Sequence, residues 1–297
     1  MSIAGGGAKH SSRALVLGGG GPVGRAWESG LVSGLIAKGV ALRTADLILG
    51  TSAGAIVGAQ LALGLDLSIA ATVPGKVGAP VPFGGMGELV SLTAQAVRAS
   101  APETHRQAIG QLALKAATPS EEQSMQRVDI LARHAWPANF RATAVDVRTG
   151  ESVVWQADSG VPLERAVASS CALPGVWPPI TIGSGRYMDG GIRSLLNADF
   201  ARGHAAVIIV SCFTLVFPEG FGSEDQKALN ASLHAEIATL RESGAHVDLI
   251  TPSAEFSTLT GNGARMLDTS LTPDAVQMGL RQASQEASGI HRIWYQN

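Results

Sequence analysis

Ser52 stands in the middle of the segment Gly50-Thr51-Ser52-Ala53-Gly54, which has the form G-x-S-x-G. An apolar stretch at 47–49 precedes it and small and apolar residues follow to about residue 63, so we expect a buried strand, a sharp turn and a buried helix. Such a turn exposes the serine Oγ near the amino end of the helix, whose dipole favours developing negative charge. Side chains at Gly50 and Gly54 would collide with a neighbouring strand or helix. The pattern predicts a nucleophile at Ser52 on an elbow formed by Gly50 and Gly54; a serine that only caps the helix is the simpler alternative.

A second candidate is the glycine run at 18–21, which follows the apolar stretch 14–17 and continues as Pro-Val-Gly. The backbone N–H groups of Gly19, Gly20 and Gly21 could converge on one anionic oxygen, as in an oxyanion hole. Gly19, Gly21 and Gly24 also satisfy G-x-G-x-x-G, so a Rossmann-type nucleotide site is the alternative. That site needs an acidic residue at the far end of the second strand, whereas Asp46 precedes this strand. A structural turn without a ligand stays open.

The third candidate is Asp189, which follows a short predicted strand at 186–188 and precedes Gly190-Gly191. A serine nucleophile requires a base within hydrogen-bond reach, and the two glycines leave room for a partner to approach. Taken alone, Asp-Gly-Gly is more typical of a simple turn. Ser52, Asp189 and His204 also occur in the order of an α/β-hydrolase triad. Because His204 precedes a predicted strand, we expect it at the opposite edge of a parallel sheet and predict that Asp189 is the base.

These candidates require a scaffold, and the chain predicts an α/β fold. Two strand-turn-helix units occupy the first 65 residues without a hairpin signal between them, which favours parallel pairing. A hairpin is expected at 140–147 and 152–156, further strands at 207–210 and 247–250, and a helix at 272–288 that Thr272 caps. We expect a flexible N-terminus at 1–12 and one domain at 13–297.

Residues 72–118 form a predicted helical cap over one end of the sheet. The segment begins rich in proline and glycine and continues with helical patterning. We expect it to supply the apolar wall of an acyl site, because such a composition is typical of a cover rather than of a packed sheet. Its apolar residues are Val81, Phe83, Met86, Leu89, Val90 and Leu92.

Composition excludes several classes of protein. Apolar residues make up 45% and charged residues 15%, which excludes a disordered chain, and a net charge of −2 without dense Lys or Arg argues against nucleic-acid binding. Cys171 and Cys212 are too few for a disulfide framework, and the seven histidines lack metal-ligand spacing, so neither a metal nor a cofactor is expected. The N-terminus lacks an apolar leader, so we expect a cytoplasmic protein with at most peripheral membrane contact.

Four blocks in this order resemble the patatin-like phospholipase family: the glycine run, the Gly-Thr-Ser-Ala-Gly elbow, the stretch 169–179 (SSCALPGVWPP) and Asp-Gly-Gly. The resemblance extends over roughly residues 13–211. It implies a three-layer α/β sandwich with a mainly parallel central sheet. It also implies hydrolysis of lipid acyl esters by a Ser52–Asp189 dyad, with Gly19, Gly20 and Gly21 as the oxyanion hole and Gly190 and Gly191 as the base loop.

The chain departs from this family beside the glycine run. Members often carry Arg or Lys two residues after the run, where this chain has Val23, and Arg25 comes two residues later. The role of Arg25, the acyl-chain length, the head group and the oligomeric state stay open. Two functions other than ester hydrolysis also stay open: the chain could be a nucleotide-binding module or a catalytically silent scaffold.

Overall fold

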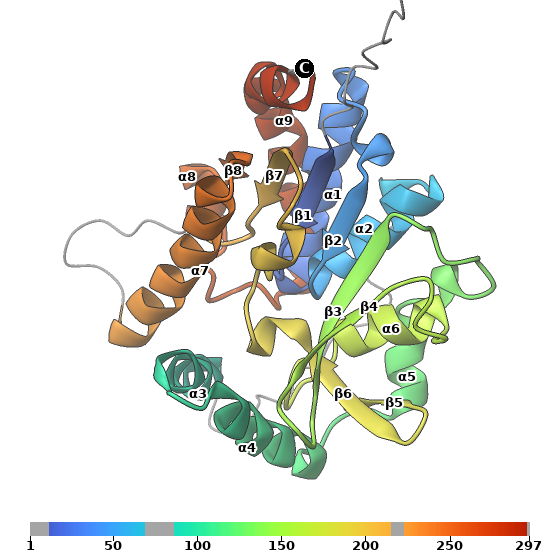
Figure 1. The fold of residues 1–297 in the computed structure, drawn as a ribbon, viewed down its shortest axis with the longest axis vertical. Coiled ribbons are helices and arrows are strands. Elements are labelled where there is room, and N and C mark those ends of the chain that lie inside the picture. Colours follow the sequence, from blue (N-terminus) through green and yellow to red (C-terminus); the bar gives the residue numbers. More distant parts are fainter. Residues whose placement is uncertain (1–11, 69–85, 215–222, 296–297) are drawn as a thin grey trace, which may run out of the picture.

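The computed structural model describes residues 12–68, 86–214 and 223–295. In this part of the chain an eight-stranded sheet lies between helices on both faces, which confirms the three-layer α/β fold (Figure 1). The strands are β1 (Arg13–Leu17), β2 (Leu47–Gly50), β3 (Phe140–Asp146), β4 (Ser152–Trp155), β5 (Ile180–Ile182), β6 (Gly185–Asp189), β7 (Ala206–Val210) and β8 (His246–Ile250). The α-helices are α1 (Gly21–Ala37), α2 (Ala53–Leu63), α3 (Met86–Arg98), α4 (Pro102–Lys115), α5 (Glu121–Gln126), α6 (Leu163–Ser170), α7 (Glu224–Glu242), α8 (Ala254–Leu259) and α9 (Thr272–Tyr295).

The sheet is mostly parallel, in the order β5-β6-β3-β2-β1-β7-β8, with β4 paired to β3. Strands β3, β2, β1, β7 and β8 are neighbours in this order and run parallel. Strands β4 and β6 pair antiparallel with β3, and β5 pairs antiparallel with β6. The parallel β1–β2 unit and the β3–β4 hairpin agree with the sequence prediction. Of the β5–β6 hairpin, the sequence predicts only the strand at 186–188, because β5 has 3 residues, which are too few to give a clear alternating pattern.

The carboxyl ends of β2 and β6 meet beside β3. Ala142 pairs with Gly50 of β2, and Ala144 pairs with Asp189 of β6, while both residues also pair with β4. A strand residue has only two paired sides, so β2 and β6 must occupy the same side of β3, one after the other. Since β6 is antiparallel to β3, its last residue faces the end of β2. This junction places the segments that follow the two strands next to each other.

Alternate residues of the central strands build two cores. Leu15 and Leu17 of β1 belong to a cluster with α1, α2 and α9, whereas Ala14 and Val16 belong to a cluster with α7. This alternation is the period of two expected of a strand that is buried on both faces. The sheet is therefore covered on both faces. The edge at which the parallel strands have their carboxyl ends is the place where a site can form.

The last helix is longer than predicted and fixes α1. Helix α9 runs to Tyr295, and its residue Thr272 is already helical, so the predicted N-cap is wrong; a short 3₁₀ turn capped by Asp268 precedes the helix. A Cβ at Gly30 of α1 would overlap the Val276 carbonyl, and one at Gly279 of α9 would overlap the Trp27 carbonyl. The two backbones are therefore in close contact, which holds the glycine run at the start of α1 in place.

The predicted cap is described only in part. Residues 72–85, with Val81 and Phe83, and the N-terminal residues 1–11 lie outside the described residues. From Met86 onward, α3 and α4 cover one end of the sheet (Figure 1). Leu89 of α3 packs in a cluster with Ile109 of α4 and with Val145 and Met188 of the sheet.

Candidate active site

The nucleophile elbow has the predicted strand-turn-helix geometry. Ser52 lies between β2 and α2 and has φ 53° and ψ −114°, a backbone conformation that is strained for any residue except glycine. A Cβ at Gly50 would overlap the backbone of Ala55 in α2, and a Cβ at Gly54 would overlap the backbone of Leu17 in β1. Both glycines are thus required by close packing, as the sequence predicts, and the strained turn directs the Ser52 side chain out of the sheet.

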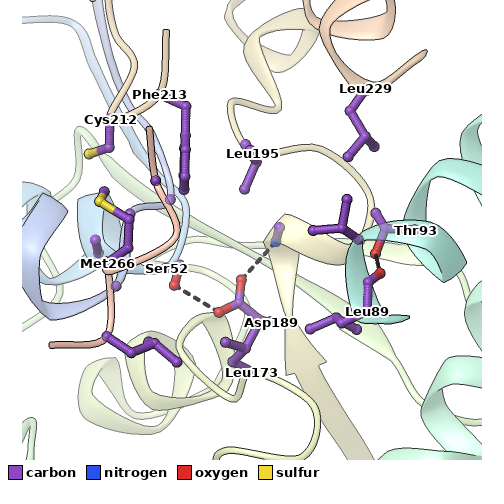
Figure 2. Close-up of a pocket in the computed structure, with 18 of the residues that line it drawn as sticks. Ser52, Leu89, Thr93, Leu173, Asp189, Leu195, Cys212, Phe213, Leu229 and Met266 are labelled. Carbon is purple, nitrogen blue, oxygen red and sulfur yellow. Dashed lines mark hydrogen bonds between the residues drawn. The ribbon is translucent and has the colours of Figure 1, made fainter. Parts of the chain in front are cut away.

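The side chains of Ser52 and Asp189 form a direct hydrogen bond. Ser52 Oγ donates to Asp189 Oδ2 over 2.7 Å, although 137 residues separate the two positions. The other carboxylate oxygen, Oδ1, accepts the Gly191 N–H at 2.8 Å (Figure 2). Asp189 is only 2% exposed. The structure therefore brings the predicted nucleophile and base together, with one carboxylate oxygen fixed by the base loop and the other facing Ser52.

Burial changes the acidity of Asp189. It raises the pKa of this carboxyl from 3.8 to about 6, against the opposing effects of hydrogen bonds from Gly191 and Ser52 and of the Arg127 charge. A carboxylate with such a pKa is a better proton acceptor than an exposed one and is ionised at neutral pH. Its loop is tightly packed, because a Cβ at Gly190 would overlap Thr143.

The glycine run lies beside Ser52, but the N–H groups of Gly19, Gly20 and Gly21 are not equivalent. A Cβ at Gly19 would lie 3.5 Å from the Ser52 Cβ, so the two residues are in contact. The Gly19 N–H donates to the Leu195 carbonyl at 2.8 Å and is not available for an oxyanion in this conformation. Within the described residues, the structure shows no acceptor for the N–H groups of Gly20, Gly21 and Ala53. Ala53, the residue after Ser52, is a further donor that the sequence pattern does not indicate.

The end of α6 supports the elbow from the other side. The Ser52 N–H donates to Ser170 Oγ at 2.9 Å, and the Cys171 thiol donates to the Ser52 carbonyl at 3.0 Å. Burial raises the pKa of the Cys171 thiol to about 12, so it stays a neutral hydrogen-bond donor. Both residues belong to the sequence block at 169–179, whose function in the site is to hold the backbone of the strained turn.

Asn197 connects the nucleophile elbow to the base loop. Its Nδ2 lies 3.1 Å from Thr51 Oγ1, 3.3 Å from Thr143 Oγ1 and 3.3 Å from the Gly190 carbonyl. It also donates to the Ser194 carbonyl at 2.6 Å, and Thr51 and Thr143 share a hydrogen bond of 2.9 Å. Thr51 precedes Ser52, and Gly190 follows Asp189. This buried network therefore fixes the two segments against each other, and no sequence motif indicates it.

Ser52 and Asp189 open into a cavity of about 930 Å³ whose lining is mainly apolar. In Figure 2, Leu89 and Thr93 on α3 and Leu229 on α7 lie on one side of this space, and Phe213 and Met266 lie on the side of Ser52. The further apolar lining residues include Val90, Val97, Leu173, Val176, Trp177, Leu195, Phe213, Leu233, Phe256, Met266 and Leu267. Of the apolar residues in the predicted cap segment, Leu89 and Val90 of α3 line this cavity, whereas Leu92 packs against the cluster formed by Leu89, Ile109 and Val145.

His204 lies away from this site. It precedes β7, and the register pairs Ala206 with Arg13 at the amino end of β1, whereas Ser52 follows the carboxyl end of β2. A strand of five residues spans about 16 Å. The His204 Nδ1 contacts the Ala201 carbonyl at 2.9 Å. The sheet therefore separates His204 from Ser52 and Asp189, which does not fit a triad of these three residues.

The alternative nucleotide site also lacks its acidic residue. Asp46 precedes β2 and accepts the Arg13 N–H at 2.7 Å, at the edge of the sheet opposite to the glycine run. Among the described residues, no group of three or more His, Cys, Asp or Glu side chains could hold a metal ion. Within the same part of the chain, no helix is long and apolar enough to span a membrane.

Comparison with known proteins connects this site to a family. A family model described as Patatin-like phospholipase matches residues 82–202, a range that contains Asp189 but not Ser52. The resemblance to the patatin-like phospholipase family is thereby confirmed over this part of the chain. No curated protein matches the sequence.

Two solved structures resemble the chain at low identity. VipD from Legionella pneumophila has 13% identity and a TM-score of 0.45, over 95% of this chain and 67% of VipD. The type III effector protein ExoU has 19% identity and a TM-score of 0.40, over 96% of this chain and 54% of ExoU. The chain thus spans about two thirds of the first protein and about half of the second.

Proposed function

We propose that this protein is a lipid acyl hydrolase that cleaves fatty-acyl esters, with Ser52 as nucleophile and Asp189 as base. The observation that carries the proposal is the 2.7 Å hydrogen bond from Ser52 Oγ to a buried carboxylate at the wall of an apolar cavity. The family match over residues 82–202 supports the same class of reaction. The cavity would hold the acyl chain, because most of its lining surface is apolar.

In the first half of the reaction, Ser52 Oγ attacks the ester carbonyl carbon while its proton passes to Asp189 Oδ2. The carbonyl oxygen becomes an oxyanion, which the N–H groups of Gly20, Gly21 and Ala53 would stabilise. The tetrahedral intermediate then breaks its bond to the alcohol oxygen, and that oxygen takes the proton from Asp189. The products of this half are the free alcohol and an acyl ester on Ser52.

In the second half, a water molecule replaces the alcohol. Asp189 accepts a proton from the water, and the hydroxide oxygen attacks the acyl carbon. The bond to Ser52 Oγ breaks, and the serine oxygen takes back the proton. A free fatty acid and the original enzyme result, so neither a metal nor a redox cofactor is required by this scheme.

The proposal is tested by covalent labelling with a fluorophosphonate followed by peptide mapping. We expect modification at Ser52 and hydrolysis of a short acyl ester, with both lost in Ser52→Ala by about 10³-fold or more. Ser243→Ala is the matched control, because Ser243 ends α7 with its hydroxyl on the Leu240 carbonyl and does not line the cavity. Folded protein that takes up no label would contradict the hydrolase. Retention of NAD(H) in that case would favour the nucleotide-binding module. A folded protein that neither takes up the label nor retains NAD(H) would favour the silent scaffold.

A further inference from the structure

The side chain of Leu195 fills the gap between the glycine run and the base loop. Its Cδ2 methyl lies 3.4 Å from the position that a Cβ would take at Gly19 and 3.5 Å from the corresponding position at Gly191. The Gly19 position is 3.5 Å from the Ser52 Cβ. The Gly191 position is 3.0 Å from Asp189 Oδ1. One leucine methyl therefore lies against the loops on both sides of the Ser52–Asp189 pair.

The backbone around Leu195 is fixed, so the side chain cannot move aside together with its loop. The Leu195 carbonyl accepts the Gly19 N–H at 2.8 Å. On the C-terminal side, the N–H groups of Leu196 and Asn197 donate to Ser194 Oγ at 3.1 and 2.9 Å. Leu196 itself is buried in the core below the sheet edge. A substrate that approaches Ser52 must therefore fit beside the Leu195 side chain, which can adapt only by rotation about its own bonds.

Leu195 lies on the path from Ser52 to the walls that α3 and α7 form. In Figure 2 it is drawn between Ser52 and Leu229 of α7, and all three residues line the cavity. The acyl chain of the proposed reaction extends along these walls, which also include Leu89 of α3. The carbonyl carbon is bonded to Ser52 Oγ in the tetrahedral intermediate. The carbon next to the carbonyl is therefore the part of the chain that has to pass Leu195 with the least freedom to move.

We propose that Leu195 determines acyl specificity by selecting esters that are unbranched at the carbon next to the carbonyl. This inference rests on the proposed acyl hydrolase function and adds which acyl chains the site accepts. A methyl branch on that carbon would compete with the Leu195 methyl for the same space, and a closely packed site accepts an additional carbon only at a cost. A branch at the far end of the chain would not reach Leu195. One methylene group in an apolar pocket typically changes selection by about 10- to 200-fold.

Binding to the Ser52→Ala protein tests this selection without catalysis. The ligands are three isomers of one formula: methyl heptadecanoate, racemic methyl 2-methylhexadecanoate and methyl 15-methylhexadecanoate. We expect the linear ester and the 15-methyl isomer to bind within about threefold of each other, and the 2-methyl isomer about tenfold more weakly or worse. With Leu195→Ala added, the 2-methyl isomer should come within about threefold of the linear ester. A 2-methyl isomer that binds the Ser52→Ala protein as tightly as the linear ester would overturn the selection.

Three further variants separate the size of the Leu195 side chain from its contribution to folding. Leu195→Met nearly conserves the volume and should keep the preference for the linear ester. Leu229→Ala removes the same group from the α7 wall and should leave this preference unchanged, because a branch next to the carbonyl does not extend to that wall. If Leu195→Ala does not fold, Leu195→Val shortens the side chain by one carbon and should weaken the preference in the same direction.

Kinetics connect the selection to the reaction. In enzyme with an intact Ser52, kcat/KM for the linear ester should exceed that for the 2-methyl isomer by about 10- to 200-fold beyond their ratio in alkaline hydrolysis. Leu195→Ala should raise the relative kcat/KM of the 2-methyl isomer by about tenfold or more. An equal change for all three esters would overturn the selection, because it would show a general effect on the two loops. A binding preference that depends on Leu195, in a protein that neither labels at Ser52 nor hydrolyses esters, would support the selection and contradict the hydrolase.

Discussion

Substitution of Asp189 by Asn should change how the stability of the protein depends on pH. The pKa of Asp189 is raised by burial, so the folded state holds this proton more tightly than the unfolded state. The neutral Asp189 carboxyl contributes its full share of stability below about pH 4, the pKa of this group in the unfolded state. That contribution is lost as the pH rises through about 6, the pKa of this group in the folded state. Asparagine has nearly the same shape and cannot ionise. The wild type should therefore lose stability relative to Asp189→Asn as the pH rises.

The size of this change follows from the two pKa values. A rise from 3.8 to about 6 is about two pKa units, and each unit corresponds to 1.36 kcal/mol, so the ionised carboxylate costs about 3 kcal/mol. Most of this difference should develop between pH 4 and pH 6. It is a large part of the 5–15 kcal/mol that is typical of a folded domain. The buried acid therefore reduces stability at the pH where it would serve as the base.

The assay is urea unfolding of both proteins at several pH values between 4 and 8, with the free energies of unfolding compared at each pH. Asp225→Asn is the control, because the hydrogen bond from Arg98 lowers the pKa of Asp225, so this carboxyl is ionised in both the folded and the unfolded state above about pH 5 and the difference between this variant and the wild type should stay constant there. In parallel, kcat/KM of the wild type should rise through a single ionisation near pH 6. Unfolding curves of wild type and Asp189→Asn that keep a constant difference over this range would refute the burial argument.

Three further substitutions test the geometry. Asn197→Gly removes the amide but keeps the left-handed backbone, so kcat should fall about tenfold or more and fluorophosphonate labelling should slow; Arg133→Gly, at an exposed left-handed position, should change neither. His204→Ala should retain activity within about threefold, and a loss as large as that of Ser52→Ala would restore the triad. Leu89→Ser should shift the preferred acyl length more than the rate on a short ester, and an equal loss at every chain length would remove α3 from the acyl site.

The elbow is predictable from the sequence because its causes are local. Gly50, Ser52 and Gly54 lie within five residues, and the turn that they form needs only a preceding strand and a following helix. The steric role of both glycines could be inferred before the neighbours were known, since any strand-helix turn this tight excludes side chains. The continuous apolar run of β1 and the apolar character of α2 likewise predict burial without a partner being named.

The position of Asp189 depends on the tertiary structure. Its strand is antiparallel to β3, and it reaches Ser52 because β3 extends past the end of β2 and pairs with β6 there. Register between strands far apart in sequence leaves no local signal, since it is fixed by the packing of the whole sheet. For the same reason no motif indicates Asn197 or Leu195, whose side chains join segments that only the folded sheet brings together. The sequence thus predicts which residues carry the chemistry, and the pairing of β2, β3 and β6 makes them a site.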